Sequence, residues 1–202
     1  MDATDAGANA LTAMLTLSHP RKVEVSEWAQ TALQPPAGVD GFDAARWRAA
    51  AAFGVQGSCT PPEHGGTGAS AVELMLLFEG LGHAGVDTGL AFALASHTVT
   101  VERALAEFGS PEQVARWIPP ILAGDAVGAF AMTESGSGSD PWSMETVAVA
   151  DGGGYVLNGS KTWITLAPFA DLAIVFARTD PDAGHWGVSA FVVDLAAEGV
   201  TR

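Results

Sequence analysis

The pattern of apolar residues changes near Gly124-Asp125, and this change constrains the fold more than any other feature of the sequence. The residues before it form long runs of good helix formers with apolar side chains at helical spacing. The residues after it form short runs of β-branched and aromatic residues, separated by Gly-rich and Asn-Gly turns. The sequence therefore predicts an α+β protein with an all-α domain at residues 1–124. An antiparallel, barrel-like β domain follows at residues 125–202.

Polar residues at the start of three of the expected helices are favourable there. Ser26 is a candidate N-cap, Asp43 lies at the favourable end of the helix dipole, and Ser110 is followed by Pro111 at the first helical position. Pro119-Pro120 is expected to end the last helix. The predicted helices span residues 9–17, 27–33, 43–53, 70–81, 89–105 and 111–118.

The expected strands are short and evenly spaced. Because no strand alternates with a helix, the glycine-rich loop in this region is not a Rossmann dinucleotide motif. The spacing is typical of an antiparallel sheet or barrel. The predicted strands span residues 126–132, 146–149, 155–157, 161–165, 172–177 and 188–194.

Three polar residues stand alone in the helical part. Glu79 is an acid in an apolar helix, and taken alone it is a candidate proton-transfer group. His97 has no second metal-ligating residue at suitable spacing, which favours a hydrogen-bonded core histidine. Cys59 is the only cysteine, so an intrachain disulfide and a cysteine-cluster metal site are excluded, and its Pro-rich surroundings indicate a turn. No metal site is predicted.

The chain of 202 residues is strongly acidic, with a formal net charge of −14. Such a surface repels phosphates, which argues against nucleic acid as a partner. An acidic surface that maintains solubility is favoured, and docking to a basic partner is the alternative. The acidic start of the chain does not resemble a secretion signal, and no apolar run is long enough to span a membrane. The expectation is a cytoplasmic protein without a membrane segment.

Two separated segments carry the strongest functional signal. Residues 130–140 pass from apolar residues through Thr-Glu into a Gly/Ser loop, where backbone N–H groups and hydroxyls can approach an anionic ligand closely. Residues 158–165 place an indole between a lysine and two hydroxyl side chains. Together they predict a site for a flat, phosphate-bearing cofactor.

These two segments resemble signature motifs of the acyl-CoA dehydrogenase family of flavoproteins. The family pattern T-E-P-G-x-G-S-D corresponds to Thr133–Asp140, with Ser135 in place of the proline, and N-G-x-K-x-W-I-T corresponds to Asn158–Thr165. The likeness continues in Pro62–Gly68, in residues 108–113 and in residues 117–124, and covers about residues 40 to 202. For Glu79, the resemblance favours a structural ion pair or a cap contact over a proton-transfer role.

The resemblance implies that the chain binds FAD. Thr133 is expected at the pyrimidine end of the isoalloxazine, Trp163 on the ring, and Thr165 near N5, while Ser139 is expected at the phosphates and the acyl thioester arm. Each residue taken alone is an ordinary strand residue or surface hydroxyl. The two motifs in sequence favour the flavin interpretation. The implied cofactor-binding residues are Phe130, Met132, Thr133, Ser139, Trp163, Ile164 and Thr165, with Ser139 also implied for the substrate.

The resemblance also implies that the catalytic base of the reaction is not among these residues. In the family, the glutamate base comes from a C-terminal helical domain, so no catalytic residue is assigned here. The comparison with the family also implies that the β domain at residues 125–202 is incomplete at its C-terminal end. A fragment is one explanation. The favoured prediction is a hetero-oligomer in which a complementary subunit carries that domain. The implied activity is oxidation of an acyl-CoA or acyl-carrier-protein thioester to its α,β-unsaturated product, with an electron-transfer flavoprotein as acceptor. A related flavin oxidase or hydroxylase, and a non-catalytic binding protein, are the alternatives.

Overall fold

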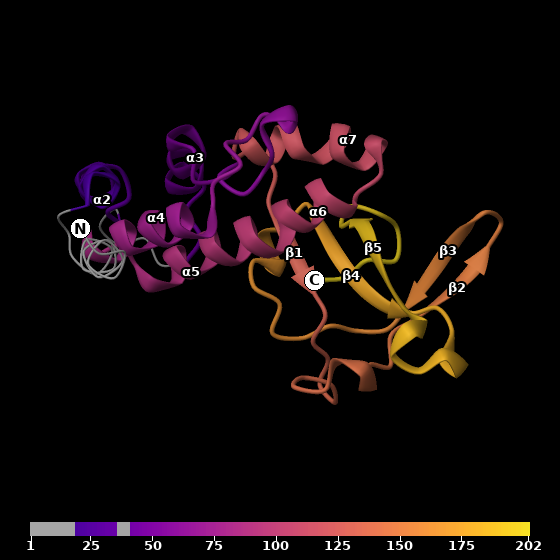
Figure 1. Cartoon of the computed structure of the whole chain (residues 1–202). Helices are drawn as coiled ribbons and strands as arrows, with labels where there is room; N and C mark the ends of the chain where they lie inside the picture. The colour runs from indigo at the N-terminus through magenta and orange to yellow at the C-terminus, as the bar shows by residue number, and fades with distance from the viewer. Residues whose placement is uncertain (1–18, 36–40) are drawn as a thin grey trace, which may run out of the picture. The chain divides into compact units, whose positions relative to one another are not determined.

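The computed structural model describes residues 19–35 and 41–202. The chain divides into two compact units, Met1–Asp125 and Ala126–Arg202. The helices belong to the first unit and the sheet to the second, which confirms the predicted α+β order (Figure 1). The predicted helix at residues 9–17 lies outside the described residues. None of the helices in the described ranges is long and apolar enough to cross a membrane.

The described part of the helical unit contains six α-helices, one π-helical segment and the short 3-10 helix Pro62–His64. Side-chain caps start several of them, among them Ser110, as the sequence predicts. The Asp43 carboxylate accepts from the Ala45 N–H at 2.8 Å, and both Ser70 and Ser110 form capping boxes. The elements are α2 (Pro20–Ala32), α3 (Ala44–Phe53), α4 (Ala71–His83), α5 (Thr88–Ser96), the π-helix His97–Glu102, α6 (Arg103–Phe108) and α7 (Pro111–Leu122).

Two predicted helix boundaries are wrong. Helix α2 begins at Pro20 with His19 as its cap, and Ser26 is buried inside the helix. Proline suits the first helical position because its missing N–H would have no partner there. Helix α7 continues through Pro119 and Pro120 to Leu122. The carbonyls four residues before these prolines belong to exposed residues, so water can take the place of the lost N–H donors.

The π-helix brings His97 and Glu102 into contact although they are five residues apart. Their Nδ1 and Oε1 atoms are 3.0 Å apart, and both side chains are completely buried. Glu102 also accepts the Gly57 N–H at 2.6 Å, which ties the Pro/Gly-rich loop to this helix. The prediction of a hydrogen-bonded core histidine is confirmed. The Glu79 carboxylate likewise forms the predicted ion pair, with Lys22 of α2.

The second unit holds a five-stranded sheet. Its strands are β1 (Gly128–Ala131), β2 (Val147–Asp151), β3 (Gly154–Asn158), β4 (Leu172–Arg178) and β5 (Val188–Asp194). Strand β4 lies between β1 and β5 (Figure 1). Its first three residues, Leu172, Ala173 and Ile174, are at most 5 % exposed. The β2–β3 hairpin joins the sheet at Val147, which pairs with Arg178.

The sheet is mixed, whereas the sequence analysis expected antiparallel pairing throughout. Strands β4 and β5 and strands β2 and β3 are antiparallel, but β1 and β2 both run parallel to β4. The β2–β3 hairpin and the loops around it lie between β1 and β4 in sequence. This long connection returns the chain to the end of the sheet where β1 began, as parallel pairing requires.

The predicted strand at residues 161–165 is wrong. These residues form a loop in which Trp163 has a φ of 58°, and Leu166 just beyond has a φ of 68°. A left-handed backbone interrupts an extended run. Contacts with residues 132–134, described below, hold this loop and outweigh its local preference for a strand.

We expect Gly80→Ala to lower the free energy of unfolding by about 1 to 3 kcal/mol. A Cβ atom at Gly80 of α4 would lie 2.7 Å from the Val25 Cβ atom of α2, so the two helices would have to separate. Gly82→Ala is the matched control in the same helix, because a Cβ atom there meets nothing within 4 Å. It should stabilise the protein by up to about 1 kcal/mol through helix propensity. Equal denaturation midpoints for the two variants would contradict the packing argument.

Candidate functional site

A buried ion pair joins the two sequence motifs. The Lys161 ammonium lies 2.7 Å from the Glu134 carboxylate and also donates to the Met132 carbonyl at 2.9 Å. The Thr162 N–H donates to the Thr133 carbonyl at 2.9 Å. Segments almost thirty residues apart in sequence are therefore fixed side by side.

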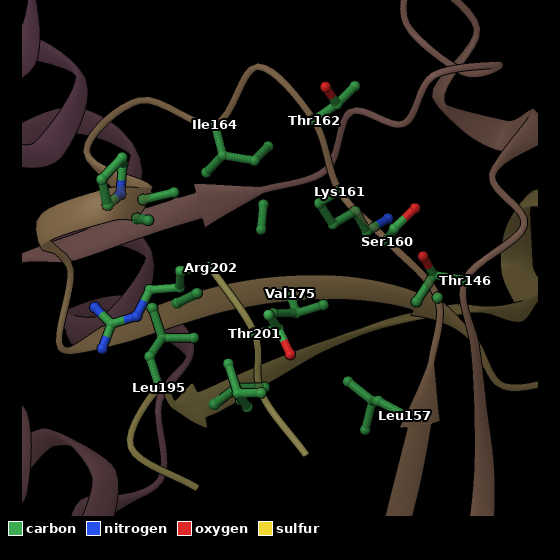
Figure 2. A pocket seen from close by; sticks show the side chains of 18 of the residues that line it. Thr146, Leu157, Ser160, Lys161, Thr162, Ile164, Val175, Leu195, Thr201 and Arg202 are labelled. Atoms are coloured by element: carbon green, nitrogen blue, oxygen red, sulfur yellow. The ribbon is translucent and has the colours of Figure 1, made fainter. Parts of the chain in front are cut away.

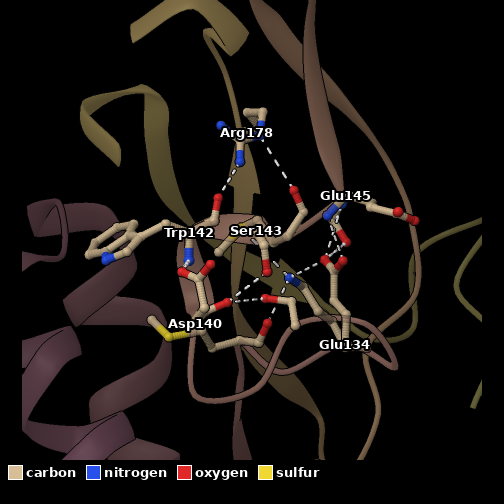
Figure 3. A network of polar contacts seen from close by, with 11 residues as sticks. Glu134, Asp140, Trp142, Ser143, Glu145 and Arg178 are labelled. Carbon is tan, nitrogen blue, oxygen red and sulfur yellow. Dashed lines mark hydrogen bonds and ion pairs between the residues drawn. The ribbon is translucent and has the colours of Figure 1, made fainter. Parts of the chain in front are cut away.

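Glu134 is the centre of this polar network, part of which Figure 3 shows. Its carboxylate accepts the N–H groups of Glu145 and Thr146 at 2.6 and 3.0 Å, and it also accepts the Thr146 hydroxyl. Burial opposes ionisation of Glu134, but the bonds from Lys161, Thr146 and the two N–H groups outweigh it and lower the pKa to about 2. Glu134 is therefore an ionised structural anchor, not a proton donor or acceptor near neutral pH.

A cavity of about 880 Å³ lies against one face of the sheet, a volume typical of small-molecule sites. In Figure 2, Ile164, Thr162 and Lys161 lie across the hollow from Leu195. Small apolar residues of β1, β4 and β5 form its floor, and residues 159–165 form a wall. The floor residues are Ala129, Ala131, Ala173, Val175 and Val193.

Trp163 is the most exposed large apolar side chain among the described residues, at 89 %. Its left-handed backbone, with a φ of 58°, is unusual for a bulky residue and costs free energy. Trp163 is one of the residues that line the cavity. A strained backbone that holds an aromatic ring in solvent is typical of a ligand-binding position.

The structure places the predicted cofactor residues in two groups. Trp163, Ile164 and Thr165 line the cavity. Phe130 lies on the opposite face of the sheet from its neighbours Ala129 and Ala131, and its ring packs 4.9 Å from that of Phe176.

The other predicted residues touch the site through their backbone or not at all. The carbonyls of Met132 and Thr133 bond to the loop that carries Trp163, and neither residue is among those that line the cavity. Ser139 is exposed in the Gly/Ser loop and does not line the cavity either.

The sequence analysis gave no role to Glu134, Thr146 or Arg202. Glu134 and Lys161 lie in the two recognised motifs. An acidic residue in one motif and a basic residue in the other could have suggested that they form an ion pair. No signal pointed to Thr146, which bonds to Glu134, or to Arg202, which lines the cavity and donates to the Ala170 carbonyl at 2.5 Å.

The comparisons with known proteins agree with this arrangement. The family profile "Acyl-CoA dehydrogenase, N-terminal domain" matches residues 22–125, and the profile "Acyl-CoA dehydrogenase, middle domain" matches residues 129–202. Together they cover nearly the whole chain. The protein belongs to the acyl-CoA dehydrogenase family.

Two curated relatives illustrate the range of similar proteins. The L-prolyl-[peptidyl-carrier protein] dehydrogenase of a Serratia species is 38 % identical over 154 residues, which are 76 % of this chain and 40 % of the relative. The caffeyl-CoA reductase-Etf complex subunit CarC of Acetobacterium woodii is 40 % identical over 151 residues, which are 75 % of this chain and 39 % of the relative.

A solved structure described as the FAD complex of PigA superposes with a TM-score of 0.73 at 31 % identity. The match covers 98 % of this chain and 50 % of that chain. Family members thus bind FAD, and the chain spans about half the length of the relatives it matches or less.

We expect Glu134→Gln to remove a stabilising contribution that depends on pH. The pKa of Glu134 falls from 4.5 to about 2 on folding, so its ionised form contributes stability above about pH 4.5. That contribution is lost as the pH falls toward 2. At pH 7 the substitution should cost about 3 kcal/mol, the equivalent of this pKa difference. Chemical denaturation between pH 7 and pH 2.5 measures the effect.

Asp151→Asn is the matched control, because Asp151 is an exposed carboxylate at the β2–β3 turn. Its stability should follow the wild-type curve. If the gap between wild type and Glu134→Gln stayed constant down to pH 2.5, the anchor role of the ionised carboxylate would be refuted.

Proposed function

We propose that this chain forms the N-terminal and middle part of an FAD-dependent dehydrogenase that oxidises an acyl thioester to its α,β-unsaturated product. The observation that carries the proposal is the exposed, strained Trp163, fixed beside Thr133 by the Glu134–Lys161 anchor. An indole, small hydroxyl groups and an apolar surface are the features that a flavin ring requires.

The residues present fit the ring part of FAD. The Trp163 indole offers a free face for stacking, and Thr165 beside it offers a hydroxyl for an edge of the ring. The Gly/Ser loop would contribute backbone N–H groups to the phosphates of FAD. There is room for a ligand at this loop, because a Cβ atom at Gly136 or Gly138 would meet no other atom within 4 Å.

The proposed reaction needs a hydride acceptor, which FAD supplies when bound, and a base that removes the proton next to the thioester carbonyl. In this chain, Trp163 and Ile164 would cover the ring and exclude water. None of the described residues that line the cavity carries a carboxylate. We propose that the base comes from a C-terminal helical domain, carried by a complementary subunit.

Charge supports the same conclusion. Residues 126–202 contain three basic side chains, Lys161, Arg178 and Arg202. Each of the three already bonds to protein groups: Lys161 to Glu134, Arg178 to the carbonyls of residues 142, 144 and 184, and Arg202 to the Ala170 carbonyl. A diphosphate needs positive charge or many N–H donors. The hetero-oligomer proposal assigns this missing charge to the partner.

The substrate and the electron acceptor are also proposals. The Serratia relative is named for a carrier-protein substrate, and CarC for a CoA substrate and an Etf complex. We therefore propose a thioester on CoA or on a carrier protein, with an electron-transfer flavoprotein as the acceptor.

We expect Trp163→Ala to weaken flavin binding about tenfold or more, as loss of one aromatic stacking partner does. The experiment uses the chain co-purified with a subunit that carries the C-terminal helical domain. Visible absorption of bound flavin measures occupancy, and bleaching on addition of an acyl thioester measures turnover.

Phe108→Ala is the matched control, because Phe108 is also strongly exposed, at 80 %, but lies in the helical unit. It should retain the flavin. The proposal would be refuted by a wild-type complex that binds no flavin, or by a Trp163→Ala complex that binds as much flavin as the wild type.

A further inference from the structure

Three aromatic side chains away from the cavity form an exposed cluster. The rings of Trp142 and His185 lie 5.6 Å apart, and those of His185 and Trp186 lie 5.3 Å apart. Trp142 is 50 % exposed and Trp186 is 85 % exposed. We call Trp142, His185 and Trp186 the aromatic platform. None of the three lines the cavity.

The platform is built from two loops, one that contains Trp142 and Met144 and one that contains Gly184, His185 and Trp186. Arg178 bonds to both. Its guanidinium donates to the carbonyls of Trp142 and Met144 in one loop and of Gly184 in the other. Figure 3 shows Arg178 beside the turn that carries Trp142 and Ser143, with dashed lines to its carbonyls. An arginine that satisfies three carbonyls fixes the relative positions of the loops, so the rings are held in place.

The second loop is also closed at its base. The Gly187 carbonyl accepts the N–H groups of Thr179 and Asp180 at 2.8 and 3.1 Å and the Thr179 hydroxyl at 3.1 Å. A Cβ atom at Gly187 would lie 1.8 Å from the Asp180 carbonyl oxygen, so only glycine allows this closure. Two tryptophans are thus kept in solvent by an ordered framework, which is typical of an interaction surface.

The charge around the platform is negative. Asp140, Glu145, Asp180 and Asp182 are all exposed and lie in the same two loops. Asp140 and Asp180 each accept a backbone N–H, from Trp142 and Asp182, which leaves oxygen atoms available to an outside donor. The Arg178 guanidinium between the two loops already donates to the carbonyls of Trp142, Met144 and Gly184.

We propose that the aromatic platform docks an arginine-rich segment of another protein. Guanidinium groups stack on indole faces and form paired hydrogen bonds with carboxylates, so they match both the rings and the acidic rim. The negative charge of the whole chain attracts such a segment. Phosphate-bearing ligands and anionic membranes meet repulsion from the same carboxylates. The proposal does not depend on flavin binding at the cavity.

The test titrates the full chain with the synthetic peptide acetyl-Gly-Arg-Gly-Arg-Gly-Arg-amide and follows tryptophan fluorescence and calorimetry at low ionic strength. We expect Trp142→Ala and Trp186→Ala each to weaken binding about threefold or more, although neither changes the net charge. Asp180→Asn combined with Asp182→Asn should weaken it further. Gly187→Ala should also weaken it, because it opens the loop while both tryptophans remain.

Two controls separate docking from general attraction. Glu198→Gln removes one exposed charge outside the two loops, and Trp163→Ala removes an exposed indole at the cavity. Both should bind the peptide as the wild type does. Equal binding by wild type, Trp142→Ala and Trp186→Ala would overturn the proposal and show attraction by net charge alone. Stronger binding of AMP or of anionic phospholipid vesicles than of the peptide, lost in Trp186→Ala, would also overturn it.

Discussion

The ion pair between Glu134 and Lys161 is the constraint on which the candidate site depends. It holds the loop after β1 against the loop after β3. The Thr146 hydroxyl and the N–H groups of Glu145 and Thr146 donate the remaining hydrogen bonds to the Glu134 carboxylate. Removing one charge of a buried pair leaves the other without compensation, which is why such a pair fixes position even where it adds little net stability. The strained backbone of Trp163 directly follows Lys161 and Thr162, the two residues through which this anchor holds the loop.

The helical unit uses the same device in a different setting. Glu102 is completely buried and joins His97 on its own helix to Gly57 in the Pro/Gly-rich loop. The π-helical turn makes this possible, because i and i+5 residues then face each other. In both units a buried carboxylate organises a loop that has no regular secondary structure. Neither carboxylate faces the cavity, so both are positioning groups for the backbone.

The surface of the sheet unit separates two kinds of recognition. The cavity is apolar at its floor and is also lined by Trp163, which suits a flat, largely apolar ring. The aromatic platform carries indoles among carboxylates, which suits a cation. Because the basic side chains of this unit are bonded to protein groups, both proposals assign positive charge to a partner protein. The strongly acidic composition would thus favour association with a basic partner protein as well as solubility.

The sequence by itself determined the order of helices and strands, the Ser110 cap and the family, because these depend on local residue patterns. Ser110 caps α7 through a bond to the N–H of Gln113, three residues away. Only the tertiary structure decided that residues 161–165 form a loop, that β1 runs parallel to β4, and that Phe130 faces away from the cavity. These features depend on contacts between residues far apart in sequence, such as Lys161 with Glu134, and no local pattern records which distant partner will outweigh a strand preference.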